Sequence, residues 1–183
     1  MNRTRNWWKL ARGVTLIELM VTLAIIAILA SLAAPSFQSL LENNRISTIT
    51  NQFTGALTYA RAEAITRNKR VVVCKVANAT LARPQCQSGA AWDNGWIIFI
   101  DDDANAQLGA NELLLRVVGS IPASYSVQSQ NNVPWIAFLP SGLAKFSGAA
   151  TGETYAVTPP AGVGHASSKV IKVATTGRAR IED

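Results

Sequence analysis

The chain has 183 residues, and its 17 Lys and Arg outnumber its 11 Asp and Glu, which gives a formal net charge of +6. Four of the basic residues precede Gly13, and without them the balance falls to 13 against 11, so the bulk charge does not indicate a nucleic-acid partner. A single histidine, His165, and two cysteines exclude a zinc site built from Cys and His, and we expect no cofactor.

An uncharged stretch near the N-terminus predicts a membrane-spanning helix. It runs from Leu19 to Leu41, and at about 1.5 Å per residue it is long enough to cross a hydrocarbon core of about 30 Å. Basic residues before this stretch are expected to keep the N-terminus in the cytoplasm and to place the rest of the chain outside the membrane. They are Arg3, Arg5, Lys9 and Arg12.

One acidic residue, Glu18, lies at the start of the apolar stretch, shortly after Gly13. An unpaired carboxylate in lipid is costly, so its position requires a reason. An ordinary secretory signal with its cleavage site at Ser31-Leu32-Ala33 does not explain an acidic residue in its apolar region. A plain single-pass anchor and a segment that later leaves the membrane predict the same topology, and both interpretations stay open at this point.

Together, Gly13, Glu18, the apolar run and Pro35 resemble the class III signal of type IV prepilins and type II secretion pseudopilins. In that family a membrane peptidase cleaves after the glycine and methylates the new N-terminus, which here is Val14; the family most often has phenylalanine at this position. The resemblance also implies that the Glu18 carboxylate pairs with the N-terminus of a neighbouring subunit during assembly.

The periodicity of apolar residues changes along the rest of the chain. Intervals of three and four after Pro35 predict an amphipathic continuation of the helix to about Asn68. Short apolar runs between Gly, Pro and Asn then predict strands. The predicted strands are Arg70 to Val76, Trp96 to Ile100, Glu112 to Val118, Tyr125 to Gln128, Trp135 to Leu139, Thr154 to Val157 and Lys169 to Thr175.

These elements predict an α+β fold, with a long N-terminal helix packed against a C-terminal antiparallel β-sheet head. The resemblance implies that this is the type IV pilin fold. The expected segments are a leader over residues 1–13, a membrane or filament-core helix over 14–34, its amphipathic continuation over 35–68, and a β-rich head over 69–183.

Two further patterns are similar to the GspH/FimT branch of pseudopilins. One is an Ala-Arg-x-Glu-Ala run over residues 60–64, and the other is a Trp-x-x-Gly-Trp pattern over 92–96 followed by Phe99 and Asp101. The resemblance implies other pilins and the prepilin peptidase as partners. It also implies a single-pass protein of the bacterial inner membrane, with its head in the periplasm, that later enters a pilus or pseudopilus.

Two cysteines, Cys74 and Cys86, lie in the part of the chain expected outside the cytoplasm. Disulfides persist in that compartment, so we expect the two cysteines to pair and to close a short loop. Two buried free thiols are the alternative.

The densest acidic cluster has the spacing of a calcium loop. Asp101, Asp103, Asn105 and Glu112 stand at positions 1, 3, 5 and 12 of an EF-hand pattern. However, the sixth position is Ala106 where the turn prefers glycine, and the flanking residues predict strands instead of helices. We favour a solvated acidic turn and keep these four residues as a calcium-loop candidate.

The C-terminus carries a pair of arginines after a glycine turn, a pattern that is also typical of a solvated edge or a filament contact. On a strand, Arg178 and Arg180 would project to the same side about 6.5 to 7 Å apart, close to the spacing of phosphates along a nucleic-acid strand. The Gly-Arg-x-Arg tail resembles the FimT minor pilins of natural transformation, in which this motif takes part in DNA binding; Lys172 is a further candidate contact. Related GspH proteins also often end in Gly-Arg, and Glu182 and Asp183 would partly neutralise the tail.

No catalytic set is recognisable in the sequence, so we expect neither an enzyme nor a small-molecule substrate. His165 has no nucleophile partner, and Ser141 lacks the elbow pattern of hydrolases. Two hypotheses remain. The first is a FimT-like minor pilin at the tip or initiation complex of a type IV pilus, which binds extracellular DNA non-specifically for natural transformation. The second is a GspH-type minor pseudopilin of a type II secretion system without DNA binding.

The leader gives the first testable prediction. Replacing Gly13 by a bulky residue, as in Gly13→Val, should block cleavage, because the peptidase depends on a glycine at this position. Intact-mass measurement of the membrane fraction should then show the full precursor for the variant and the shortened chain for the wild type. Normal maturation of Gly13→Val would contradict the assignment of the cleavage site.

Overall fold

The computed structural model describes residues 13–148, 151–160 and 167–182, and it leaves the side chains of residues 33–36 undescribed. Most of the expected leader, His165 and Asp183 therefore lie outside the described residues. The chain divides into two compact units between Gln38 and Ser39. One helix, α1 (Leu16–Arg67), begins in the first unit and ends in the second.

The first unit contributes an apolar helical surface. Its large apolar side chains between Val14 and Leu32 are exposed, with 78% of Leu16 accessible. By length and composition, α1 is able to cross a membrane, and no other described helix has this property. Exposed apolar surface of this extent requires lipid or other protein around it.

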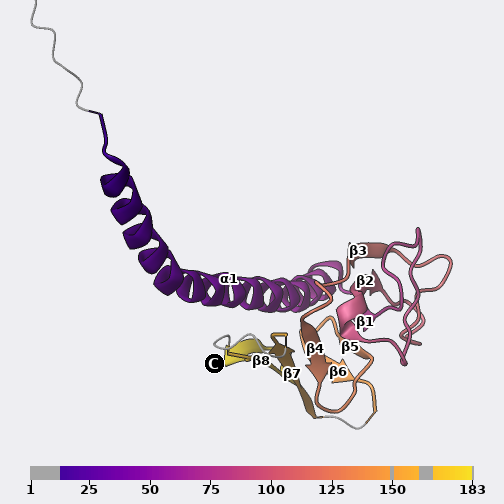
Figure 1. The fold of residues 1–183 in the computed structure, drawn as a ribbon. Coiled ribbons are helices and arrows are strands. Elements are labelled where there is room, and N and C mark those ends of the chain that lie inside the picture. Colours follow the sequence, from indigo (N-terminus) through magenta and orange to yellow (C-terminus); the bar gives the residue numbers. More distant parts are fainter. Residues whose placement is uncertain (1–12, 149–150, 161–166, 183) are drawn as a thin grey trace, which may run out of the picture. The chain divides into compact units, whose positions relative to one another are not determined.

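The second unit contains two antiparallel sheets (Figure 1). The five-stranded sheet has the order β3-β2-β1-β5-β6, and the four-stranded sheet has the order β4-β7-β8-β9. The strands of the first sheet are β1 (Val71–Lys75), β2 (Trp96–Ile100), β3 (Leu114–Val118), β5 (Trp135–Phe138) and β6 (Ala144–Phe146). Those of the second are β4 (Ser126–Ser129), β7 (Gly152–Thr158), β8 (Lys169–Ala174) and β9 (Ala179–Glu182), and a short 3-10 helix, η1 (Trp92–Asn94), precedes β2.

This architecture confirms the predicted α+β fold, and each of the seven predicted strands has a counterpart. Strand β6 was missed, because it has only three residues with an exposed Lys145 between two buried ones. The C-terminal residues form strand β9, which begins at Ala179, one residue after Arg178. Strand β7 extends beyond the predicted Thr154 to Val157 at both ends, because β8 pairs with it from Gly152 onwards.

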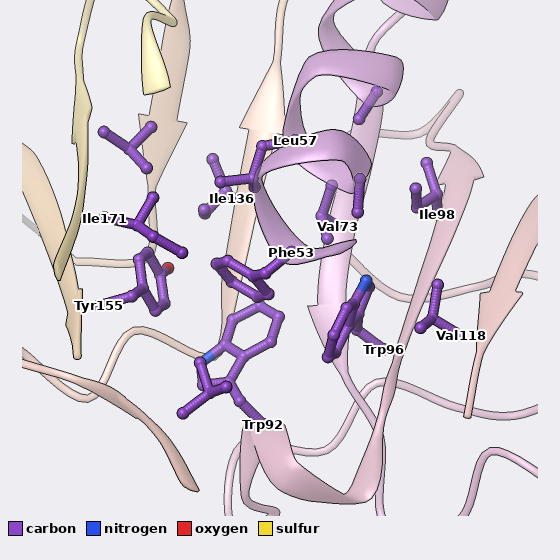
Figure 2. Packing of buried hydrophobic residues seen from close by; sticks show 14 of the residues in the cluster. Phe53, Leu57, Val73, Trp92, Trp96, Ile98, Val118, Ile136, Tyr155 and Ile171 are labelled. Carbon is purple, nitrogen blue, oxygen red and sulfur yellow. The ribbon is translucent and has the colours of Figure 1, made fainter. Parts of the chain in front are cut away.

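The second half of α1 packs against both sheets, and its Phe53 contacts aromatic residues of both. Figure 2 shows its ring between Tyr155 of β7 and Trp96 of β2, with Trp92 of η1 beside it. Its ring centroid lies 4.8 Å from that of Tyr155, 5.1 Å from that of Trp96 and 5.3 Å from that of Trp92. Such pairs contribute about 0.5 to 1.5 kcal/mol each beyond the apolar area they bury. Phe53 thus joins α1 and the two sheets in one core.

The five-stranded sheet is also buried on its other face. A second apolar cluster there contains Val72 and Ile97 of the central strands together with Ala106 and Leu108 of the loop that follows β2. Because both faces are covered, β1 and β2 are buried along their whole lengths. This explains why their sequences are continuous apolar runs without alternation.

Cys74 and Cys86 form a disulfide at this second face, with their Cα atoms 5.6 Å apart. Cys74 belongs to β1 and is fully buried, and Cys86 pairs with Val76 in an isolated bridge. The bond therefore fastens the loop after β1 to the edge of the cluster.

Removing this bond should destabilise the head. The double variant Cys74→Ala, Cys86→Ala should lower the free energy of unfolding by about 2 to 3 kcal/mol, because the unfolded chain regains the freedom of a short closed loop. Urea unfolding of the detergent-solubilised chain, followed by Trp fluorescence, measures the loss. Dithiothreitol should destabilise the wild type similarly and leave the double variant unchanged; a wild type insensitive to reduction would contradict a stabilising role.

Candidate functional site

The N-terminus of α1 is capped by the side chain of Thr15. The Thr15 hydroxyl accepts a hydrogen bond from the Glu18 backbone N–H at 3.3 Å, and the Thr15 carbonyl accepts one from the Leu19 N–H at 3.1 Å. Glu18 thus lies in the first turn, where the helix dipole favours a negative charge. Within the described part of the chain its carboxylate forms no ion pair. Gly13 and Val14 precede the helix and are exposed.

The basic residues of the C-terminal strands lie together on one sheet face. Lys172 of β8 and Arg180 of β9 are direct cross-strand partners. Arg178 stands two residues before Arg180 and therefore shares its face, while the alternate residues Ile171 and Val173 point into the core. All three basic side chains line an open groove, whose other lining residues include Gly152, Thr154, Thr176 and the buried Glu153. The structure thus brings together the three residues that the sequence selected.

A tight turn joins β8 to β9 and is fastened to α1. Gly177 has φ +76°, and a Cβ at this position would lie 2.0 Å from the Gly142 carbonyl oxygen, so only glycine fits. The Arg61 guanidinium donates to the carbonyl oxygens of Gly142 and Thr176, each at 3.0 Å. Sequence reasoning identified Arg61 only as part of a family pattern and missed this role, because the contacts join residues far apart in the chain.

One acidic residue, Glu182, neutralises part of the groove. Its carboxylate lies 2.6 Å from the Lys172 ammonium and 2.5 Å from the Arg180 guanidinium. The hydrogen bond from Lys172, together with the charge of Arg180, lowers the pKa of Glu182 below its usual value. Arg178 forms no ion pair or hydrogen bond with the described residues, so it is the cation of this group most available to a ligand.

The acidic loop between β2 and β3 brings its carboxylates together. Carboxylate oxygens of Asp101, Asp103 and Glu112 lie within 4.8 Å of one another, and Asn105 donates to Asp103 at 2.6 Å. The turn forms without glycine, because Ala106 itself adopts a left-handed conformation with φ +59°. Ala106 thus takes a conformation that favours glycine, and the loop is flanked by strands β2 and β3, as the sequence predicted.

The family model described as Type II transport protein GspH matches residues 50–177. The chain belongs to the GspH family. The model of the prokaryotic N-terminal methylation motif matches residues 8–34, which include Gly13 and Glu18. No curated protein matches the sequence.

Solved structures similar to this GspH-family protein include the type IV minor pilin FimU of Pseudomonas aeruginosa in two crystal forms. In space group P21 it shares 18% identity and a TM-score of 0.58 over 79% of this chain and 92% of FimU. In space group P65 it shares 17% identity and a TM-score of 0.54 over 75% of this chain and 92% of FimU. The minor pseudopilin EpsH of Vibrio cholerae shares 12% identity and a TM-score of 0.48 over 74% of this chain and 94% of EpsH. The likeness to FimU shows the type IV pilin fold.

The Gly177 turn gives a prediction with an internal control. Gly177→Ala should lower the free energy of unfolding by about 3 kcal/mol or more, because it adds a clash with Gly142 to an unfavourable backbone conformation. Gly148→Ala has a similar φ of +74° but no described atom within 4 Å of the new Cβ, and should cost only about 1 kcal/mol. Equal losses in urea unfolding would show that crowding at Gly177 contributes nothing.

Proposed function

We propose that this GspH-family protein is a minor pilin that binds extracellular DNA non-specifically through the groove lined by Lys172, Arg178 and Arg180. In this proposal the peptidase cleaves after Gly13, Val14 becomes the methylated N-terminus, and the apolar part of α1 holds the subunit in the inner membrane with its head in the periplasm. Glu18 then pairs with the N-terminus of a neighbouring pilin as the subunit joins the tip or initiation complex of a type IV pilus.

The observation that carries the DNA-binding proposal is the cross-strand pairing of Lys172 with Arg180, with Arg178 on the same face. Three cations on one exposed edge are suited to successive phosphates, and the planar guanidinium fork binds phosphate oxygens in pairs. The groove is open to solvent. Contacts to phosphates position DNA without regard to sequence, which fits uptake of arbitrary DNA.

A second candidate function is supported by Glu182 and by the family description. Glu182 forms ion pairs with two of the three cations and reduces the charge that a phosphate would meet. An edge with its charge reduced in this way is suited to contact another subunit. The matching family model is described as a type II transport protein. Under this alternative the subunit belongs to a secretion pseudopilus and binds no DNA.

DNA affinity and its salt dependence distinguish the two functions. The detergent-solubilised chain should bind fluorescent duplex DNA with an affinity that falls between about 50 and 200 mM salt, with a log–log slope of about −2.7 if three phosphates are engaged. Arg178→Gln, Arg180→Gln should reduce the slope to about −0.9 and remove most of the binding. Glu182→Gln should tighten binding, because it releases Lys172 and Arg180. Fluorescence anisotropy at several salt concentrations measures the DNA affinity of the wild type, of the double arginine variant and of Glu182→Gln.

A matched control removes the same charge elsewhere on the head. Lys145→Gln, Arg116→Gln takes two exposed cations from the five-stranded sheet and should leave DNA affinity nearly unchanged. If the wild type does not bind at low salt, or if both double variants bind equally well, the secretion pseudopilin becomes the better assignment.

A further inference from the structure

The loop between β2 and β3 contains a carboxylate with one unsatisfied oxygen. The Asp101 side chain is fully buried. Its Oδ2 accepts a hydrogen bond from the Ala106 N–H at 3.1 Å and lies 3.3 Å from Nε of Arg70. Its Oδ1 is also buried but accepts no hydrogen bond from any described residue. A buried carboxylate oxygen without a partner is costly, so this oxygen points to a ligand.

Two further carboxylates converge on Asp101. Oxygens of Asp101, Asp103 and Glu112 lie within 4.8 Å of one another. Ligand oxygens on opposite sides of a calcium ion are about 4.6 to 5.2 Å apart, so these three fit around a single ion. Arg70 contacts Oδ2 of Asp101, and Lys69 pairs with the neighbouring Asp102 at 2.8 Å. Arg70 also donates to the Ala104 carbonyl oxygen at 2.6 Å, so one cation lies beside the cluster.

Backbone hydrogen bonds hold the other ligand groups in place. Glu112 accepts from the Asp102 N–H at 2.8 Å and from the Gly109 N–H at 2.7 Å. Asp103 accepts from the Asn105 N–H at 3.2 Å, and Asn105 accepts from the Gln107 N–H at 2.6 Å. Ionised carboxylates offer about four acceptor sites, so Glu112 and Asp103 keep lone pairs for a cation.

We propose that the loop from Asp101 to Glu112 binds one Ca²⁺ through the carboxylates of Asp101, Asp103 and Glu112 and the side-chain oxygen of Asn105. The ligands are hard oxygens on a loop, without His or Cys, which suits calcium and not zinc. Mg²⁺ requires closer octahedral geometry and retains its water, so it fits this loop poorly. Burial raises the pKa of Asp101, with Asp103 and Glu112 adding to the rise and Arg70 opposing it.

Calcium bound here would stiffen a structurally important loop. The loop joins β2 to β3, and its Ala106 and Leu108 belong to the apolar cluster on the second face of the five-stranded sheet. A cation bound by residues at both ends of the loop would hold Ala106 and Leu108 against the sheet. Binding should therefore raise the unfolding temperature, because the ion binds the folded state and not the unfolded one.

The test compares two neighbouring Asp→Asn changes in the detergent-solubilised full chain. Calcium titrations by isothermal calorimetry should give one saturable site with a Kd of about 10⁻⁴ to 10⁻³ M, and Ca²⁺ should raise the unfolding temperature more than equal Mg²⁺. Asp103→Asn should weaken calcium binding by roughly tenfold, because it removes one ligand charge while its amide oxygen still accepts from the Asn105 N–H. Asp102→Asn removes the same charge outside the proposed ligand set and should bind as the wild type does.

Wild-type protein that shows no saturable binding up to about 10 mM Ca²⁺ would overturn the proposal. Equal stabilisation by Mg²⁺, or equal loss of affinity in Asp102→Asn and Asp103→Asn, would also overturn it, because either outcome indicates general charge screening. The wild-type titration tests calcium binding even if Asp103→Asn folds poorly.

Discussion

The insertion of Phe53 between the two sheets is the contact on which the rest of the head depends. Neither sheet has a complete core alone: the four-stranded sheet contributes Tyr155, the five-stranded sheet contributes Trp96, and Phe53 of α1 touches both. The side chains on this part of α1 that face the sheets are buried, from Ile46 to Ala64. Since burial of apolar area is the main favourable term in folding, the helix organises both sheets.

The same helix also positions the candidate DNA-binding groove. Two turns after Phe53, Arg61 binds the carbonyl oxygens of Gly142 and Thr176, which lie in turns of different sheets. The turn that contains Thr176 leads directly into Arg178 and Arg180. One helix thus supplies an apolar contact to the core and a polar contact to the edge where cations gather, and the pairing of β9 with β8 completes that edge.

Charge balance differs between the two candidate sites. In the C-terminal groove a single carboxylate, Glu182, meets two cations at an exposed edge, where water screens such pairs and their net contribution is small. In the loop after β2 three carboxylates meet near one guanidinium, and Asp101 is fully buried. Screening by water is weaker in this buried loop, so an unpaired negative charge there costs more electrostatic energy than one at the exposed groove.

The sequence by itself determined the elements whose signals are local. An uncharged apolar stretch defined the first half of α1, and periodicity defined the second. Continuous apolar runs identified β1 and β2, and the spacing of Gly13 and Glu18 indicated the class III signal, whose methylation motif the family match supports. Only the tertiary structure decided which distant groups meet: Lys172 with Arg180 and Glu182, Arg61 with the β8–β9 turn, and Asp101 with Glu112. Their proximity depends on strand pairing and helix packing, which bring together residues that no short sequence window contains.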